Sequence, residues 1–133
     1  MSEDIKQKTA ATAQLYFEGY PWDRPYDLWR SFDPGLAKDL SLFITGQMYA
    51  RQRIPHPTRQ LAAVAALTAL ERSEELRLHI WAALRVGSSP RDVAEVIFQT
   101  GVYAGMPVVN QALKVLKAVL QERQQWPPEP SQG

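Results

Sequence analysis

Residues 87–92 have the sequence Gly-Ser-Ser-Pro-Arg-Asp, and they form the sharpest helix boundary in the chain. Gly87 suits the left-handed backbone conformation in which many helices end. Ser89 and Asp92 have the spacing of a helix cap and its third-position acid, and Pro90 suits the first turn of a helix. The stretch therefore predicts that one helix ends at Gly87 and that another begins near Pro90.

Apolar residues recur at helical spacing on both sides of this boundary. They predict a helix over 74–86 and a second helix from Val93 to a break near Met106. Further helices are expected over 3–17, 34–50, 58–70 and 108–120. The alanine-rich helix over 58–70 is expected at the centre, packed antiparallel to 74–86 because the connector between them is short. No stretch alternates at period two, so the predicted fold is all-α, a single-domain bundle of about six helices.

Length and composition limit the classes of protein to which the chain can belong. Its 133 residues suffice for one domain, with a helix and an aromatic connector over 1–25, a main helical domain over 26–122 and a disordered tail over 123–133. The net charge of +1 gives no general electrostatic case for binding nucleic acid or an anionic membrane. The N-terminus has no signal pattern, and no apolar run reaches the roughly 20 residues of a membrane span. We therefore expect a cytoplasmic protein.

The sequence contains no cysteine. This excludes disulfides, thiolate metal ligands and thiol redox chemistry within the chain. The two histidines, His56 and His79, do not have the spacing of a recognised metal motif, so we predict no bound metal. His56 lies between two prolines and is expected to be exposed.

Short motifs on three of the predicted helices follow one another in a fixed order. Thr58-Arg59 opens the alanine-rich helix, Glu75-Leu76-Arg77-x-His79 lies on the next one, and Tyr103-Ala104-Gly105-x-Pro107 precedes the last. Further matching positions are Ala82, Ala83, Gly87, Ser89, Asp92, Glu95 and Asn110. In type and spacing these motifs resemble those of the carboxymuconolactone decarboxylase family, over about residues 26–118. The resemblance implies an alkylhydroperoxidase-like fold and a homo-oligomer, either a trimer or a hexamer.

This resemblance also implies an activity, the loss of carbon dioxide from 4-carboxymuconolactone to give 3-oxoadipate enol-lactone in aromatic catabolism. Cleavage moves electrons through the ring alkene onto the lactone carbonyl, so the enzyme must anchor the substrate, stabilise a dienolate and protonate carbon. No metal or organic cofactor is needed for these steps. The expected partners are a small carboxylate or lactone substrate and other copies of the chain, without nucleic acid or membrane.

Three residues are candidates for the catalytic steps. His79 is expected to act as acid or base, because an imidazole titrates near neutral pH. Glu75 lies one turn earlier and can orient the ring, and Tyr103 can donate a hydrogen bond to a developing oxyanion. Each has a structural alternative, namely an interhelical hydrogen bond for His79, an ion pair for Glu75 and simple packing for Tyr103.

The expected substrate-binding residues lie around a proline-broken loop. Arg51 and Arg59 coincide with family positions, and a guanidinium suits a carboxylate, although a solvated basic loop is the alternative. Gln47 and Tyr49 complete the set. Decarboxylase members have Gly-Glu-x-Trp at this place, whereas this chain has Gly46-Gln47-Met48-Tyr49. The amide of Gln47 cannot take up or release a proton.

Two alternatives to the decarboxylase stay open. The first is a non-catalytic binding or assembly domain of the same fold, which Gln47 favours. The second is a different enzyme of the fold that acts on another lactone or β-keto acid, which Met48 and Tyr49 would suit. Thiol peroxidase chemistry is excluded, because the cysteine pair of the related alkylhydroperoxidase branch falls at Arg72 and Glu75 in this chain.

Overall fold

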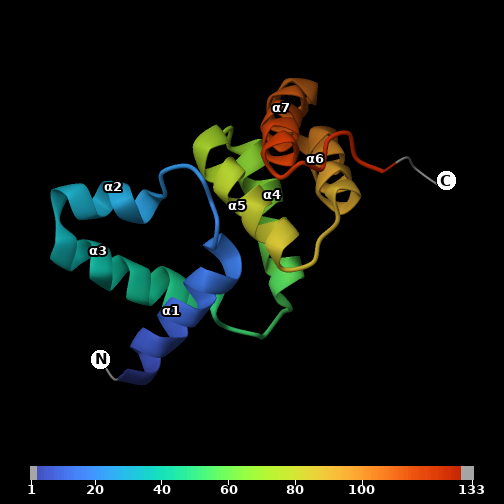
Figure 1. Cartoon of the computed structure of the whole chain (residues 1–133). Helices are drawn as coiled ribbons and strands as arrows, with labels where there is room; N and C mark the ends of the chain where they lie inside the picture. Colours follow the sequence, from blue (N-terminus) through green and yellow to red (C-terminus); the bar gives the residue numbers. More distant parts are fainter. Residues whose placement is uncertain (1–2, 130–133) are drawn as a thin grey trace.

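Eight helical segments follow one another along residues 3–129, which are the residues that this computed structural model describes (Figure 1). They are α1 (Glu3–Phe17), α2 (Pro25–Phe32), α3 (Pro34–Ser41), the π-helix η1 (Leu42–Tyr49), α4 (His56–Ala69), α5 (Ser73–Arg85), α6 (Pro90–Ala104) and α7 (Met106–Glu122). No strand occurs between residues 3 and 129, so the predicted all-α class is confirmed. Within the same range, no helix is both long and apolar enough to cross a membrane.

The helices α4 to α7 form the main bundle (Figure 1). In it, α5 and α6 each pack on both α4 and α7. Ile80 of α5, Val64 of α4, Ile97 of α6 and Val109 of α7 are fully buried where these helices meet. Burial of such a side chain contributes about 1.5–3 kcal/mol. The central helix is α5, with eight of its 13 residues buried, and not the alanine-rich α4 as the sequence suggested. Alanine favours a helix without deciding which face is buried, and several alanines of α4 are exposed.

The boundary at 87–92 has the geometry that its sequence predicts. Gly87 adopts a φ of +112°, in the region that favours glycine. The Ser89 hydroxyl accepts a hydrogen bond from the Asp92 N–H at 3.0 Å, and the Asp92 carboxylate accepts one from the Ser89 N–H at 3.2 Å. This capping box satisfies two donors that would otherwise be free, and α6 begins at Pro90.

The segment before α4 differs from the sequence prediction in two places. The sequence predicted no helix between the aromatic connector and residue 34, whereas α2 begins at Pro25. Proline suits this position because a backbone N–H in the first helical turn has no helical partner. The helix expected over 34–50 is divided into α3 and η1. A π-helix of eight residues leaves no separate periodic pattern in a sequence, so apolar spacing does not reveal this change.

The N-terminal segments stand beside the main bundle. In Figure 1, α2 and α3 form a hairpin to one side of it, and α1 packs on both η1 and α5. Tyr16 and Phe17 at the end of α1 pack with Leu78 and Ala82 of α5 in a second, smaller core. The end of α1 therefore carries aromatic side chains to the helix that holds His79.

Residues 123–129 of the tail lie against α6 and α7. The Lys117 ammonium stands 4.9 Å from the centre of the Trp126 ring, and Arg91 donates a hydrogen bond to the carbonyl of Glu129. Trp126 supplies an apolar anchor for these residues, which belong to the tail that the sequence predicts to be disordered. The rest of the predicted disordered tail, 130–133, lies outside the described residues.

A close helix contact at Gly46 gives a first testable prediction. A Cβ at this position would lie 2.1 Å from Oγ1 of Thr9 and 3.0 Å from Cδ1 of Ile5, both on α1. We expect Gly46→Ala to lower the free energy of unfolding by about 1–3 kcal/mol, because α1 and η1 must move apart. Gly35→Ala is the matched control, since its Cβ meets no atom nearer than 3.7 Å. Equal free energies for the two variants in urea denaturation would refute the prediction.

Candidate functional site

His79 lies in the middle of α5 and is buried, with 7% of its surface exposed. Its Nδ1 atom lies 2.7 Å from Oε1 of Gln60 on α4, and its Nε2 atom lies 3.5 Å from the hydroxyl of Tyr49 at the end of η1. The rings of Tyr49 and Phe17 pack edge-on against the imidazole, with centroids 5.6 and 6.4 Å away. Side chains from α1, η1 and α4 therefore surround one imidazole on α5.

The contact with Gln60 fixes which ring nitrogen of His79 carries the hydrogen. Because an amide oxygen only accepts hydrogen bonds, Nδ1–H donates to Gln60 and Nε2 keeps a lone pair. Burial lowers the pKa of His79 to about 4, so the resting ring is neutral near neutral pH. The ring can give a proton from Nε2 only after it has taken one up.

A second polar group adjoins Tyr49. Tyr16 of α1 is fully buried, and its hydroxyl lies 3.2 Å from the carbonyl oxygen of Tyr49 and 2.5 Å from Nδ1 of His56. Burial raises the pKa of both tyrosines, which are therefore neutral hydrogen-bond donors. The expectation that His56 is exposed is wrong. Its ring is half-buried at the start of α4 and packs edge-on against Tyr16, with centroids 5.2 Å apart.

Arg59 brings a positive charge to this cluster from the first turns of α4. Its Nη2 atom donates to the carbonyl of Arg51 at 2.9 Å, and its Nε atom is buried without a hydrogen-bond partner among the described residues. Burial and then the charge of Arg59 lower the pKa of His56. Leaving a buried charged donor unpaired is costly. The position of Arg59 beside the cluster therefore favours an anionic ligand.

Two predicted catalytic residues lie outside the contacts of His79. Glu75 is exposed one turn earlier on α5, and the ring nitrogen that it was expected to orient binds Gln60 instead. Tyr103 is 80% exposed at the end of α6. The amide of Gln60 thus takes the orienting role that the sequence suggested for Glu75, because α4 packs directly on α5.

The predicted binding residues divide in the same way. Tyr49 contacts His79, and Arg59 acts on Tyr49 through its charge. Gln47 is exposed on η1. Arg51 contacts Arg59 through its backbone carbonyl, and its own side chain is exposed.

Sequence reasoning missed Tyr16 and Gln60 and misplaced His56. One signal for Gln60 was present, because it shares a four-residue spacing with Val64 and Thr68, the other buried residues of α4. A polar residue on a buried helix face must have a hydrogen-bond partner. Tyr16 and His56 carry no comparable signal, since they are 40 residues apart and meet only through the tertiary fold.

The chemical character of the cluster follows from its side chains, which are aromatic rings, imidazoles, an amide and a guanidinium. Such groups suit hydrogen bonding, proton transfer and anion binding. Between residues 3 and 129, no three histidine, cysteine, aspartate or glutamate side chains are grouped so that they could hold a metal ion.

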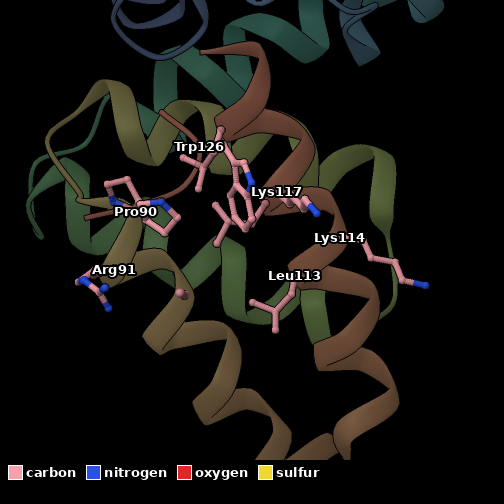
Figure 2. Close-up of a pocket in the computed structure, with 10 residues that line it drawn as sticks. Pro90, Arg91, Leu113, Lys114, Lys117 and Trp126 are labelled. Carbon is pink, nitrogen blue, oxygen red and sulfur yellow. The ribbon is translucent and has the colours of Figure 1, made fainter. Parts of the chain in front are cut away.

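Two cavities lie away from this cluster. One, of about 320 Å³, lies between α6, α7 and the tail, and Figure 2 shows Trp126 and Lys117 next to each other in its lining. The other, of about 290 Å³, lies between α2 and α3 and is lined by Leu28 and Phe32 among others. His79 lines neither cavity, and the hydroxyl of Tyr49 faces its Nε2 atom.

The buried imidazole predicts a pH dependence of stability. The pKa of His79 is about 4 in the folded chain and about 6.5 when unfolded, so the unfolded state binds more protons between these values. Stability is therefore complete above about pH 6.5 and falls as the pH drops towards 4. The His79 contribution to the free energy of unfolding should fall by about 3 kcal/mol between about pH 7 and pH 4.

Urea denaturation of the parent protein and of His79→Gln at both pH values isolates this contribution, because the other titrating groups are common to both chains. The parent should lose about 3 kcal/mol more than the variant. Equal losses would show that the His79 ring is not held in its neutral form.

Comparison with known proteins bears on the same part of the chain. Residues 34–118 match the family model described as the carboxymuconolactone decarboxylase family. A 4-carboxymuconolactone decarboxylase of Acinetobacter baylyi is 32% identical over 91 residues, which cover 68% of each chain. An uncharacterised 15.0 kDa protein of Paracoccus denitrificans is 30% identical over 91 residues, covering 67% of this chain and 68% of its own. The matched region includes η1, α4 and α5, which carry most of the cluster.

Proposed function

The chain belongs to the carboxymuconolactone decarboxylase family, and we propose that it is a cofactor-independent decarboxylase of 4-carboxymuconolactone or a related lactone or keto acid. The observation that carries this proposal is a neutral, oriented imidazole in contact with Tyr49, whose hydroxyl in turn lies within the influence of the Arg59 charge. Gln60 orients His79, and Nε of Arg59 is buried without a partner among residues 3–129. A carbon–carbon lyase that acts on a carboxylate needs both an anion-binding group and a proton-transferring group.

The reaction defines what each group does. The bond between the ring carbon and its carboxylate breaks, carbon dioxide leaves, and the electron pair moves through the alkene onto the lactone carbonyl. The resulting dienolate then takes up one proton at carbon. In this proposal Arg59 binds a substrate carboxylate, and the rings of Tyr49 and Phe17 provide apolar surroundings that favour loss of a charged group.

His79 supplies the proton in two steps. A bound anion near Nε2 stabilises the imidazolium, so we expect the pKa of His79 to rise when substrate binds. The ring then takes up a proton from solvent and transfers it from Nε2 to the dienolate carbon. Gln60 keeps Nδ1 engaged throughout, so the exchangeable proton is the one on Nε2.

Release of carbon dioxide from purified substrates tests this function and separates it from the two alternatives. The decarboxylase should turn over 4-carboxymuconolactone after treatment with a metal chelator. A different enzyme of the fold would act on another lactone acid or a β-keto acid in the same panel. Absence of turnover with every substrate would reject the proposed activity and favour a non-catalytic binding or assembly domain.

We also propose that the protein self-associates as a trimer or a hexamer. Large apolar side chains are exposed on the hairpin and at the end of α6, and Phe32, Tyr103 and Val102 are 86%, 80% and 78% exposed. Such exposure is typical of surfaces that are covered in an assembly. Light scattering should give a multiple of the chain mass at micromolar concentrations, and a monomer mass throughout that range would refute the proposal.

A further inference from the structure

The hydroxyl of Tyr16 carries a single hydrogen and contacts Tyr49 and His56, and the side chain of Gln60 also lies within its hydrogen-bonding reach. Its oxygen lies 3.2 Å from the carbonyl oxygen of Tyr49 and 2.5 Å from Nδ1 of His56. Because a carbonyl oxygen only accepts, both contacts are hydrogen bonds only if Tyr16 donates to Tyr49 and Nδ1–H of His56 donates to Tyr16. The geometry thus gives the Tyr16 hydroxyl a fixed direction and places a hydrogen on Nδ1 of His56.

One of these hydrogen bonds binds the backbone of Tyr49 at the end of η1. Tyr49 is the last residue of η1, and residues 50–55 after it are not helical. The N–H groups of Ala50 and Arg51 donate to carbonyls earlier in η1, whereas the Tyr49 carbonyl accepts from the Tyr16 side chain. The backbone of Tyr49 is therefore tied to α1 and, through His56, to the start of α4.

We propose that Tyr16 and His56 are positioning residues, which fix the backbone of Tyr49 and so hold its ring and hydroxyl against Nε2 of His79. The Tyr49 ring packs edge-on against both Tyr16 and His79, with centroids 5.9 Å and 5.6 Å away. Its hydroxyl stands 3.5 Å from Nε2. The inference rests on the proposed function, which makes Nε2 the proton-transferring atom.

Two consequences follow for the reaction. The Tyr49 ring keeps water from the imidazole and so preserves the desolvation that lowers the pKa of His79. The Tyr49 hydroxyl also stands beside the atom that a substrate must approach, and it is a hydrogen-bond donor. A ligand with an oxygen acceptor, such as a carboxylate, can accept a hydrogen bond from the Tyr49 hydroxyl. An apolar ligand leaves this hydroxyl without a partner. Tyr49 is thereby a specificity determinant, and its placement depends on Tyr16 and His56.

Tyr16→Phe removes the hydroxyl and keeps the buried ring. We expect the pKa of His79, followed by NMR in the ligand-free protein, to rise by about one unit, because water gains access when Tyr49 loosens. The kcat for decarboxylation should fall about five- to tenfold, the usual effect of one lost hydrogen bond, with KM little changed. His56→Leu should act in the same way. His56→Asn, unlike His56→Leu, should keep the His79 pKa and the kcat of the parent protein, because the Asn amide can place a donor where Nδ1 lies.

Tyr20→Phe is the matched control, since this half-buried hydroxyl accepts from Nε of Arg77 at 3.3 Å outside the cluster. It should leave the pKa of His79 and kcat unchanged. The Tyr16→Phe, Tyr49→Phe double variant should be no slower than Tyr49→Phe alone, because Tyr16 acts through Tyr49.

A Tyr16→Phe variant with a lower melting temperature but an unchanged His79 pKa would overturn the positioning role and leave only a structural one. Additive losses of kcat in the double variant would overturn it as well. If the parent protein releases no carbon dioxide but its His79 pKa rises in Tyr16→Phe, the positioning role stands and the proposed function fails.

Discussion

The His79→Gln variant is expected to release carbon dioxide from 4-carboxymuconolactone about 10²- to 10⁴-fold more slowly than the parent protein. Glutamine retains polar atoms near the place of Nε2, but it cannot take up a proton and deliver it to the dienolate. KM should change little, because Arg59 still binds the substrate carboxylate. Steady-state kinetics on both proteins measure the two parameters separately.

Folding must be shown to survive this substitution, because His79 is buried and bonded to Gln60 on another helix. Circular dichroism and light scattering should give nearly the helicity and mass of the parent. Glu74→Gln is a matched control, an exposed residue on the same helix without an assigned role, and it should retain the parent rate. A His79→Gln variant that unfolds, or that turns over at the parent rate, would favour the interhelical structural role.

The Arg59→Gln variant should show the second large effect, a fall of about 10- to 100-fold in kcat/KM that arises mainly from KM. Hydrogen bonds to a charged group contribute about 1.5–3 kcal/mol, which corresponds to this range. The binding signature therefore differs from the loss of kcat expected for His79→Gln, and the pair of variants assigns the two roles independently.

Arg53→Gln provides the matched control for Arg59, because it removes an exposed guanidinium from the loop that precedes α4. It should change KM less than about twofold, as is usual for a solvated surface charge. Arg59→Lys should recover part of the loss, since it keeps the charge without the planar fork. An Arg59→Gln variant with the parent KM would place the substrate carboxylate elsewhere.

Much of the fold was predictable because helix boundaries depend on local chemistry. The cap at Ser89 and Asp92 and the terminator at Gly87 are contained in six adjacent residues, and the structure has all three. The prediction failed where the decisive interactions are not local. Neither the π-helix η1 nor the central place of α5 follows from periodicity, because both depend on how helices pack on one another.

The candidate site shows the same division. His79 and Arg59 were candidates from motifs and Tyr49 from its place beside one, because few residue types can transfer protons or bind carboxylates, and their roles stay predictions. Their partners were not identifiable. Gln60 holds the imidazole in place of the expected Glu75 because α4 crosses α5 at that point, and a single sequence does not record which faces meet.

An NMR titration of the His79 ring, with and without a saturated lactone acid that cannot lose carbon dioxide, examines this site in one experiment. In the free protein the ring should be neutral with its hydrogen on Nδ1 and should titrate with a pKa of about 4. Saturation with the lactone acid should raise this pKa, and Arg59→Gln should weaken the response. A ring that titrates near its ordinary pKa of about 6.5 and does not respond to the lactone acid would contradict the assignment of His79 as the proton-transferring group.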